Sequence, residues 1–264
     1  CGFGKVQDEY VCIGEAENGG YIRLTGEKPD GDFRQEELKL DSVMDETDMI
    51  TAADMDEAGS LYLAVSRMDD KRDITGRIVK VKPDDTVQIL ADHIEENVKN
   101  IRLTADGYII GCADGVIQCF SMEGQKKYEI ENSDYTDICV AGDKLVVLTA
   151  RDIETYDISD GHMLETITSF DDTLTEGLED AASEKGKDAL SCSNIMKYDE
   201  KSDQIYIMLG TGLFAYKLSD KLGTRLTTFK SADIRYDFVV EDSDTFVAVT
   251  GDKSGNKRIV VYSL

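Results

Sequence analysis

The most regular alternation of apolar and polar residues lies between Asn97 and Asn132. Four short runs with the two-residue period of β-strands follow one another there: Lys99–Leu103, Tyr108–Ala113, Val116–Ser121 and Lys126–Ile130. The breaks between them carry turn-forming pairs, at Asp106-Gly107, Asp114-Gly115 and Glu123-Gly124. Glycine suits such hairpin turns because it accepts a positive φ without steric cost. The pattern predicts a four-stranded antiparallel meander.

The same meander recurs along the chain with less regularity. The predicted second strands start near Val11, Leu61, Tyr108, Leu145, Ile205 and Phe246. Their mean spacing of about 47 residues is typical of β-propeller blades with loops added. We therefore predict an all-β fold, a single β-propeller domain over residues 1–264 with about six four-stranded blades. The blade units cover approximately residues 10–40, 45–91, 97–132, 134–170, 194–230 and 234–264.

We expect both end blades to be incomplete. The first unit shows three strands and no inner one, because the stretch before Tyr10 is short and Gly-rich. The last unit shows an inner, a second and a third strand before the sequence stops at Leu264. Since an unpaired sheet edge is an aggregation hazard, Tyr10–Thr25 and Arg258–Leu264 are expected in adjacent or shared blades. One or two strand positions there would be empty or filled by a longer parent chain.

An interruption separates the fourth and fifth units. Residues 171–193 are acidic, rich in small residues and without strand alternation. Long loops between blades are commonly functional or mobile. We expect a surface insertion that is more mobile than the blades.

The charge of the chain restricts its partners. It carries 54 acidic and 29 basic residues, a net charge of −25. Such a surface repels the phosphates of nucleic acids and anionic lipids, and it favours cations and basic partners. No run of about 18 apolar residues, the length of a membrane-spanning helix, is present.

The candidate metal and catalytic residues form no recognisable site. His93 and His162 lie in no HExxH pattern and have no neighbours that suggest a catalytic triad. Asp54-x-Asp56-x-x-Gly59 resembles the start of a calcium loop, but Val65 stands where the closing Glu belongs, so a turn explains it better. No cysteine pair has the spacing of a zinc ribbon. We predict no catalytic, cofactor-binding or metal-ligating residues and no cofactor.

One nucleotide-binding pattern is also explained by a turn. Gly210-Thr211-Gly212-Leu213-Phe214-Ala215 matches the spacing of a dinucleotide-binding loop. That site needs a helix next, whose N-terminus holds the pyrophosphate, whereas Leu213–Leu218 has strand periodicity.

Cys1 is the one candidate for covalent modification. A chain that begins with Cys1-Gly2 matches what remains after a bacterial lipoprotein signal peptide is removed at its lipid-carrying cysteine. We expect lipid attachment at Cys1, the only membrane association foreseen here. The alternative is that Cys1 is an arbitrary start.

Two groups of known proteins resemble this sequence. Thr155–Ile167 resembles the repeat of the quinoprotein-like propellers, although the chain lacks the Trp of that repeat and the resemblance supplies no quinone. Asp56–Val65, Arg77–Lys82, Leu103–Cys119 and Asp143–Ile158 resemble the N-terminal propeller of bacterial cell-surface lipoproteins of Gram-positive bacteria. In those proteins a solute-binding domain follows the propeller. The resemblance implies an extracellular, cell-surface location and no catalytic residues. Because no such domain follows in this sequence, the resemblance does not carry a transport function over to it.

Two function classes remain open. The first is a non-enzymatic binding or interaction module that presents a face to a protein or small-molecule ligand, with no role for nucleic acid. The alternative is a saccharide-directed hydrolase that uses carboxylates at the channel mouth. Converging carboxylates beside an open cleft would favour the hydrolase, and we prefer the binding module because no such site is evident.

Overall fold

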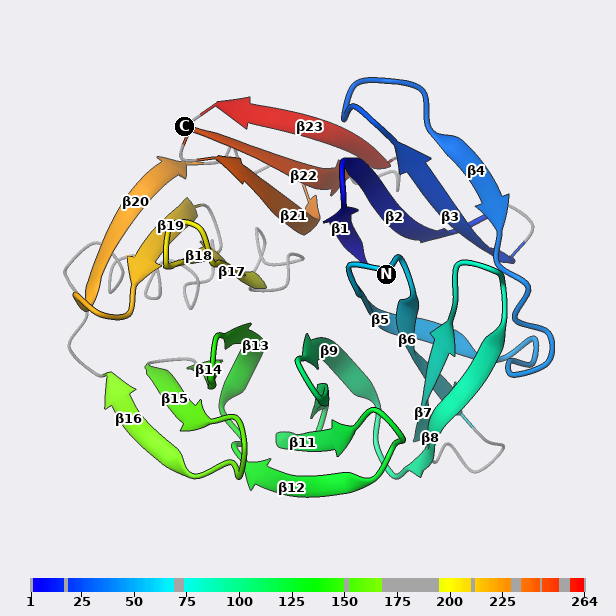
Figure 1. Ribbon diagram of the computed structural model, residues 1–264, viewed down its shortest axis with the longest axis horizontal. Coiled ribbons are helices and arrows are strands. Elements are labelled where there is room, and N and C mark those ends of the chain that lie inside the picture. The colour runs from blue at the N-terminus through cyan, green and yellow to red at the C-terminus, as the bar shows by residue number, and fades with distance from the viewer. Residues whose placement is uncertain are drawn as a thin grey trace. The chain divides into compact units, whose positions relative to one another are not determined.

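The computed structural model describes residues 2–16, 19–68, 74–149, 152–167, 195–209, 212–228, 234–242, 244–251 and 257–263. All regular elements in these ranges are β-strands, and strands consecutive in sequence pair antiparallel within each sheet (Figure 1). No helix of the length and apolar character needed to cross a membrane occurs there. The predicted all-β class is confirmed.

The chain divides into two compact units, Cys1–Ser133 and Asp134–Leu264. The first unit holds three four-stranded sheets, which we call blades 1, 2 and 3. Blade 1 consists of β1 (Phe3–Val6), β2 (Glu9–Glu15), β3 (Tyr21–Gly26) and β4 (Arg34–Glu37). Blade 2 consists of β5 (Met49–Met55), β6 (Leu61–Met68), β7 (Ile74–Val81) and β8 (Val87–Ile94). Blade 3 consists of β9 (Val98–Thr104), β10 (Gly107–Cys112), β11 (Val116–Ser121) and β12 (Lys126–Glu131).

The second unit holds two four-stranded sheets and one three-stranded sheet, which we call blades 4, 5 and 6. Blade 4 consists of β13 (Tyr135–Ala141), β14 (Lys144–Thr149), β15 (Ile153–Asp157) and β16 (Met163–Ile167). Blade 5 consists of β17 (Ile195–Asp199), β18 (Gln204–Leu209), β19 (Gly212–Lys217) and β20 (Leu222–Thr228). Blade 6 consists of β21 (Ile234–Asp242), β22 (Thr245–Gly251) and β23 (Lys257–Ser263).

Blade 3 is the meander predicted from the sequence, with one correction to its turn chemistry. Gly115 and Gly124 have positive φ angles of 95° and 80°, as the turns require. Gly107 instead starts β10 and pairs with Thr104 and Ser121. A Cβ there would lie 1.9 Å from the carbonyl oxygen of Phe120, so glycine serves close backbone approach rather than a positive φ.

Blade 1 has a strand that the sequence did not predict. β1 pairs with β2, so this blade is complete and our expectation of three strands was wrong. The Gly-rich composition that obscured β1 has a packing cause. A Cβ on Gly2 would lie 2.9 Å from Ala53, and one on Gly4 would lie 3.0 Å from the sulfur of Met55. Glycine therefore lets β1 lie close against β5 of the next blade.

Among the described residues, the last blade has three strands, as expected. Tyr10–Thr25 and Arg258–Leu264 do not share a sheet, because the first belongs to blade 1 and the described part of the second to blade 6. The predicted insertion, residues 171–193, lies outside the described residues.

Within each unit, successive blades pack face to face. Side chains from β6 and β7 meet side chains from β9 and β10 in one apolar cluster, which includes Tyr62, Ile78 and Tyr108. In the second unit, blades 4 and 5 share a cluster that includes Leu148 and Phe214. The second strand of a blade is therefore buried on both faces, as β10 and β14 show.

A carboxylate on the inner strand links one blade to the next. Asp54 on β5 accepts a hydrogen bond from the Leu103 N–H of β9 at 2.8 Å. Asp137 on β13 accepts one from the Met196 N–H of β17 at 2.6 Å, and its side chain is almost fully buried. The donors, the N–H groups of Leu103 and Met196, lie on strands at the inner edge of their sheets, where no further described strand of the same sheet accepts from them. The two carboxylates of the preceding blades accept instead.

We expect Asp137→Ala to lower the free energy of unfolding by about 1–3 kcal/mol, because it leaves the buried N–H of Met196 without this acceptor. Denaturant unfolding followed by circular dichroism measures the change. Asp143→Ala is the matched control, since Asp143 is exposed in a turn of the same blade and should change stability by less than about 0.5 kcal/mol. Equal effects of the two variants would contradict the role assigned to Asp137.

Candidate functional site

The residues singled out from the sequence do not come together. Cys1 lies outside the described residues, so lipid attachment there stays a prediction. His93 lies on β8 of the first unit and His162 precedes β16 of the second. Asp54 binds the backbone of β9, and Asp56 accepts the Ser60 N–H in its own turn, which confirms the turn interpretation of the calcium-like pattern.

The dinucleotide-like pattern lacks the element it needs. Gly210 and Thr211 lie outside the described residues, and Gly212–Lys217 forms β19. A strand therefore follows where a helix N-terminus would hold the pyrophosphate. This confirms the hairpin interpretation.

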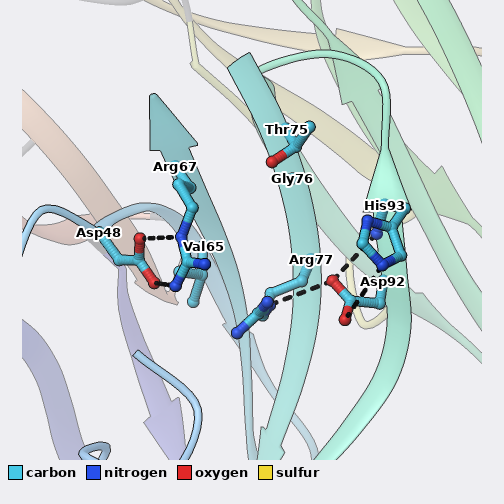
Figure 2. A pocket seen from close by; sticks show the side chains of 8 residues that line it. All are labelled: Asp48, Val65, Arg67, Thr75, Gly76, Arg77, Asp92 and His93. Carbon is cyan, nitrogen blue, oxygen red and sulfur yellow. Dashed lines mark hydrogen bonds and ion pairs between the residues drawn. The ribbon is translucent and has the colours of Figure 1, made fainter. Parts of the chain in front are cut away.

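A small hollow lined mostly by polar side chains lies at one end of blade 2 (Figure 2). The start of β5, the end of β6, the start of β7 and the end of β8 meet at this end of the sheet. The lining residues are Asp48, Val65, Arg67, Thr75, Gly76, Arg77, Asp92 and His93.

Arg67 and Asp48 form a bidentate ion pair on one side of the hollow, as Figure 2 shows. Nε of Arg67 donates to Oδ1 of Asp48 at 2.8 Å, and Nη2 donates to Oδ2 at 2.9 Å. The backbone N–H of Asp45 donates to the same carboxylate at 3.0 Å. The exposed carboxylate of Asp45 pairs with Arg67 as well. Asp48 is thus a buried carboxylate whose acceptor sites are filled.

Arg77 crosses the other side of the hollow. Its Nη1 donates to the carbonyl oxygen of Val43 at 2.5 Å, and its Nε donates to Oδ1 of Asp92 at 3.2 Å. Val43 belongs to the segment that joins blade 1 to blade 2. Arg67 and Arg77 together therefore fasten this connecting segment to the end of the sheet.

His93 follows Asp92 at an irregular point of β8. The register between β7 and β8 shifts there, and His93 has a positive φ of 57°. This is a β-bulge, which re-aims side chains at the end of a strand. The imidazole of His93 is consequently exposed beside the Arg77–Asp92 pair.

The electrostatics of the Arg67–Asp48 pair keep both of its groups charged. Burial acts to raise the pKa of Asp48, but the hydrogen bonds from Arg67 and from the Asp45 N–H outweigh it and lower that pKa below its ordinary value. The hydrogen bond to Asp48 raises the pKa of Arg67. Neither group is therefore suited to exchange a proton near neutral pH.

The hollow is too small for a substrate. Its volume is about 60 Å³, whereas pockets for small-molecule ligands commonly reach several hundred Å³. A few water molecules would fill it. The site consequently presents a polar surface feature and not a binding cavity.

Exposed apolar side chains stand at the same end of blade 2, on its other face. Met49 is paired with Ser66, and Met68 is paired with Ile74. Cross-strand partners share a face, and Ser66 and Met68 are two residues apart on β6. We call Met49, Met68 and Ile74 the apolar rim; their exposed fractions are 62%, 59% and 37%.

A second polar group lies in the turn between β15 and β16. Asp157, Asp160 and His162 bring three possible ligand atoms within 4.8 Å of one another. Each carboxylate is occupied by its own turn: Asp157 accepts from Ser159, and Asp160 accepts from the N–H of His162. The hydrogen bond to Asp160 raises the pKa of His162. Turn geometry explains this group.

Sequence reasoning did not identify the arginine–carboxylate cluster. Arg67 and Arg77 stand at strand ends next to apolar runs, where a solvated charge is the default interpretation. The signal is the position of both arginines relative to buried Val65. Arg67 follows Val65 by two residues on β6, and Arg77 is the cross-strand partner of Val65 on β7.

Comparison with known proteins establishes the fold. No protein-family model matches the chain, and no curated protein matches its sequence. A chain in a crystal structure of a nidogen–laminin complex is similar at TM-score 0.61 and 9% identity, over 97% of this chain and 94% of that one. The WD40 domain of Neurospora crassa Pan2 is similar at TM-score 0.60 and 8% identity, over 99% and 74%. BamB of Moraxella catarrhalis is similar at TM-score 0.51 and 9% identity, over 97% and 73%.

These similarities, together with the blade meanders, show that the chain has a β-propeller fold. Identities this low carry no information about activity. The resemblance to cell-surface lipoproteins stays a prediction from the sequence.

We expect Asp48→Asn to lower the free energy of unfolding at neutral pH by about 1–3 kcal/mol, because a half-buried guanidinium loses its bidentate partner. The pH dependence has a defined sign. Because the folded-state pKa of Asp48 lies below its ordinary value of 3.8, its stabilisation is complete above that pH and is lost as the pH falls through the folded value. The difference between wild type and Asp48→Asn should therefore shrink below about pH 4.

Asp45→Asn is the matched control for this experiment. Asp45 contacts the same guanidinium but is exposed, so we expect a change of less than about 0.5 kcal/mol. Urea titrations at a series of pH values measure both variants. A constant difference between wild type and Asp48→Asn across the acid range would contradict the assignment.

Proposed function

We propose that this chain is a non-enzymatic interaction module that docks a basic protein segment on the end of blade 2. The observation that carries the proposal is that two features lie at the same end of blade 2, on opposite faces of its sheet: the apolar rim, and the arginine–carboxylate cluster of Asp45, Asp48, Arg67, Arg77 and Asp92. We also propose the cell-surface location that the sequence predicts.

The apolar rim has the composition of a contact surface. Met49, Met68 and Ile74 are large side chains that cost free energy when they face water, and they gather at one end of one sheet. Two of the three are methionines, whose flexible thioethers adapt to partners of different shape. Single exposed apolar residues need no explanation, whereas three on one face within paired strands favour a covering partner.

The charge at the same end of blade 2, on the opposite face of the sheet, selects the sign of the partner. The cluster holds three carboxylates and two guanidinium groups, so it is net negative, and the whole chain carries −25. Asp45 is exposed, and its carboxylate can accept a second cation. A segment with Lys or Arg next to apolar side chains fits this surface, and long-range attraction would speed its association.

The comparisons support a protein as the partner class. Two of the similar structures come from assemblies named as a nidogen–laminin complex and a mitotic checkpoint complex. The second is similar at TM-score 0.58 and 11% identity. These names describe those proteins, and they show that this fold is found in protein assemblies.

The hydrolase alternative finds less support at this site. Glycoside hydrolysis by two carboxyl groups needs one that is protonated near neutral pH. Hydrogen bonds lower the pKa of Asp48 instead. The hollow is also too small to hold a sugar ring beside the cluster.

A synthetic peptide that alternates leucine and lysine tests the proposal, with fluorescence anisotropy as the measurement. We expect saturable binding that weakens by about tenfold or more between about 0.1 M and about 1 M salt, because screening removes the attraction. The double variant Met68→Asp with Ile74→Asp should weaken binding by about tenfold or more through loss of the apolar contact.

Two controls separate this contact from general attraction to an acidic protein. Met163→Asp with Leu164→Asp makes the same charge change at exposed apolar positions of blade 4 and should leave binding unchanged. A serine–lysine peptide of equal charge should bind more weakly than the leucine–lysine peptide. Equal loss in both double variants, or equal affinity of both peptides, would overturn the proposal.

A further inference from the structure

The methionines of the chain differ widely in exposure, and the exposed ones gather on one surface. All eight methionines lie within the described residues, and three of them have exposed side chains. Two of these three are Met49 and Met68 of the apolar rim, and the third is Met163 on β16 of blade 4, at 51% exposure. Met196 and Met208, by contrast, are buried in blade 5. The apolar rim therefore holds two of the three thioethers that face solvent.

Met49 and Met68 lie diagonally across two paired strands. Met49 on β5 is the cross-strand partner of Ser66 on β6, and Met68 follows Ser66 by two residues. Diagonal neighbours on one face of an antiparallel pair lie about 7–8 Å apart. Ser66 itself is buried, and its Oγ donates to Oδ1 of Asn97 at 2.7 Å, which holds this end of the strand in place. One partner segment can therefore cover both thioethers.

The thioether is the group of the rim that an oxidant can change. A lone pair of the sulfur attacks one oxygen of a hydroperoxide, such as hydrogen peroxide, and the O–O bond breaks. The leaving hydroxide takes up the proton of the transferred oxygen and departs as water. The sulfur loses two electrons and becomes a sulfoxide, and the peroxide gains them. The reaction needs an accessible sulfur, which Met49 and Met68 provide and buried Met196 and Met208 do not.

Oxidation would change the surface of the rim without changing the fold. A sulfoxide oxygen that an apolar partner covers loses its water and gains no hydrogen bond in return, which costs free energy. Neither Met49 nor Met68 belongs to the apolar clusters on the two faces of blade 2, so the packing of the sheet does not depend on them. Ile74 is inert to the oxidant and retains part of the apolar contact.

Three buried cysteines are protected from the same oxidant. Cys112, Cys119 and Cys139 are each at most 2% exposed. Burial raises the pKa of the Cys112 thiol to about 12 and also raises the pKa of Cys119. Because the thiolate is the form that reacts with peroxide, these thiols react slowly. The exposed thioethers of the rim are more accessible to a peroxide than these thiols.

We infer that Met49 and Met68 are modification sites, and that their oxidation to sulfoxides by a hydroperoxide releases the partner from the apolar rim. A thiol-dependent reductase returns each sulfoxide to the thioether, as two thiols become a disulfide and the oxygen leaves as water. Reduction therefore restores docking. This inference rests on the function proposed for the end of blade 2 and adds the regulation of that surface.

The test compares the affinity of the whole chain for the leucine–lysine peptide before and after treatment with hydrogen peroxide, by fluorescence anisotropy. The peptide contains no sulfur and is added after the peroxide has been removed. We expect the affinity to fall by about tenfold or more, because the sulfoxides oppose apolar contact. Methionine sulfoxide reductases of both epimer specificities, with dithiothreitol, should restore it. Mass spectrometry should find the added oxygen on Met49 and Met68 while Met196 and Met208 are still unmodified.

Two variants assign the effect to the rim. In Met49→Leu with Met68→Leu, the ratio of affinities before and after treatment should be about one, since leucine is not oxidised. Met163→Leu removes the exposed thioether of blade 4 and should keep the ratio of the wild type. Both variants retain every cysteine, so a loss caused by thiol oxidation would occur in both. Circular dichroism before and after treatment verifies that the proteins stay folded.

The outcomes separate this inference from the function on which it rests. Absence of saturable binding by the untreated chain would overturn both. Binding that peroxide leaves unchanged, or that it weakens equally in the double leucine variant, would overturn the inference about Met49 and Met68 alone. Oxidation of Met196 or Met208 ahead of the rim, or loss of the fold on treatment, would overturn it as well, because the change would not be confined to the surface.

Discussion

Face-to-face packing of successive sheets is the constraint on which the rest of this structure depends. A middle strand must be apolar on both sides, because its alternate residues serve two different clusters. In β6, Tyr62 and Ala64 pack toward blade 3, and Leu61, Leu63 and Val65 pack toward blade 1. Such strands read as continuous apolar runs rather than alternating ones. Polar chemistry is thereby excluded from the interior of each blade and confined to strand ends, turns and outer edges.

Two carboxylates on inner strands are the main exception, and they follow from the same constraint: Asp137 is buried and Asp54 is half-buried. Where two sheets meet at their inner strands, the facing backbone donors of one sheet cannot be reached by strands of the other. Asp54 and Asp137 reach across instead and accept from Leu103 and Met196. A buried carboxylate is costly unless it is hydrogen-bonded, and a buried N–H without an acceptor is costly too. The hydrogen bond from Met196 to Asp137 is buried and removes both costs at once, and the part-buried bond from Leu103 to Asp54 makes the same link between blades 2 and 3.

The sequence predicted what is local and missed what depends on distant contacts. The four strands of blade 3 were predictable because periodicity and turn residues agree there. β1 was missed because its region is rich in glycine. Gly2 and Gly4 are needed there for close packing against Ala53 and Met55 of blade 2, a contact that the composition of the segment does not reveal. The cluster around Asp48 was missed because its partner Arg67 is distant in sequence, and because charged residues at strand ends are usually solvated. Glycine is selected both by a positive φ and by close approach of another backbone segment. The sequence analysis assumed the first reason at Gly107, whereas the close approach of the Phe120 carbonyl group is the actual one.

The surface proposed for binding would recognise a partner through its side chains. The end of blade 2 presents side chains: a flexible apolar rim, and charges whose positions are fixed by bidentate pairing of Arg67 with Asp48. Recognition there depends on the sign of charge and is sensitive to salt.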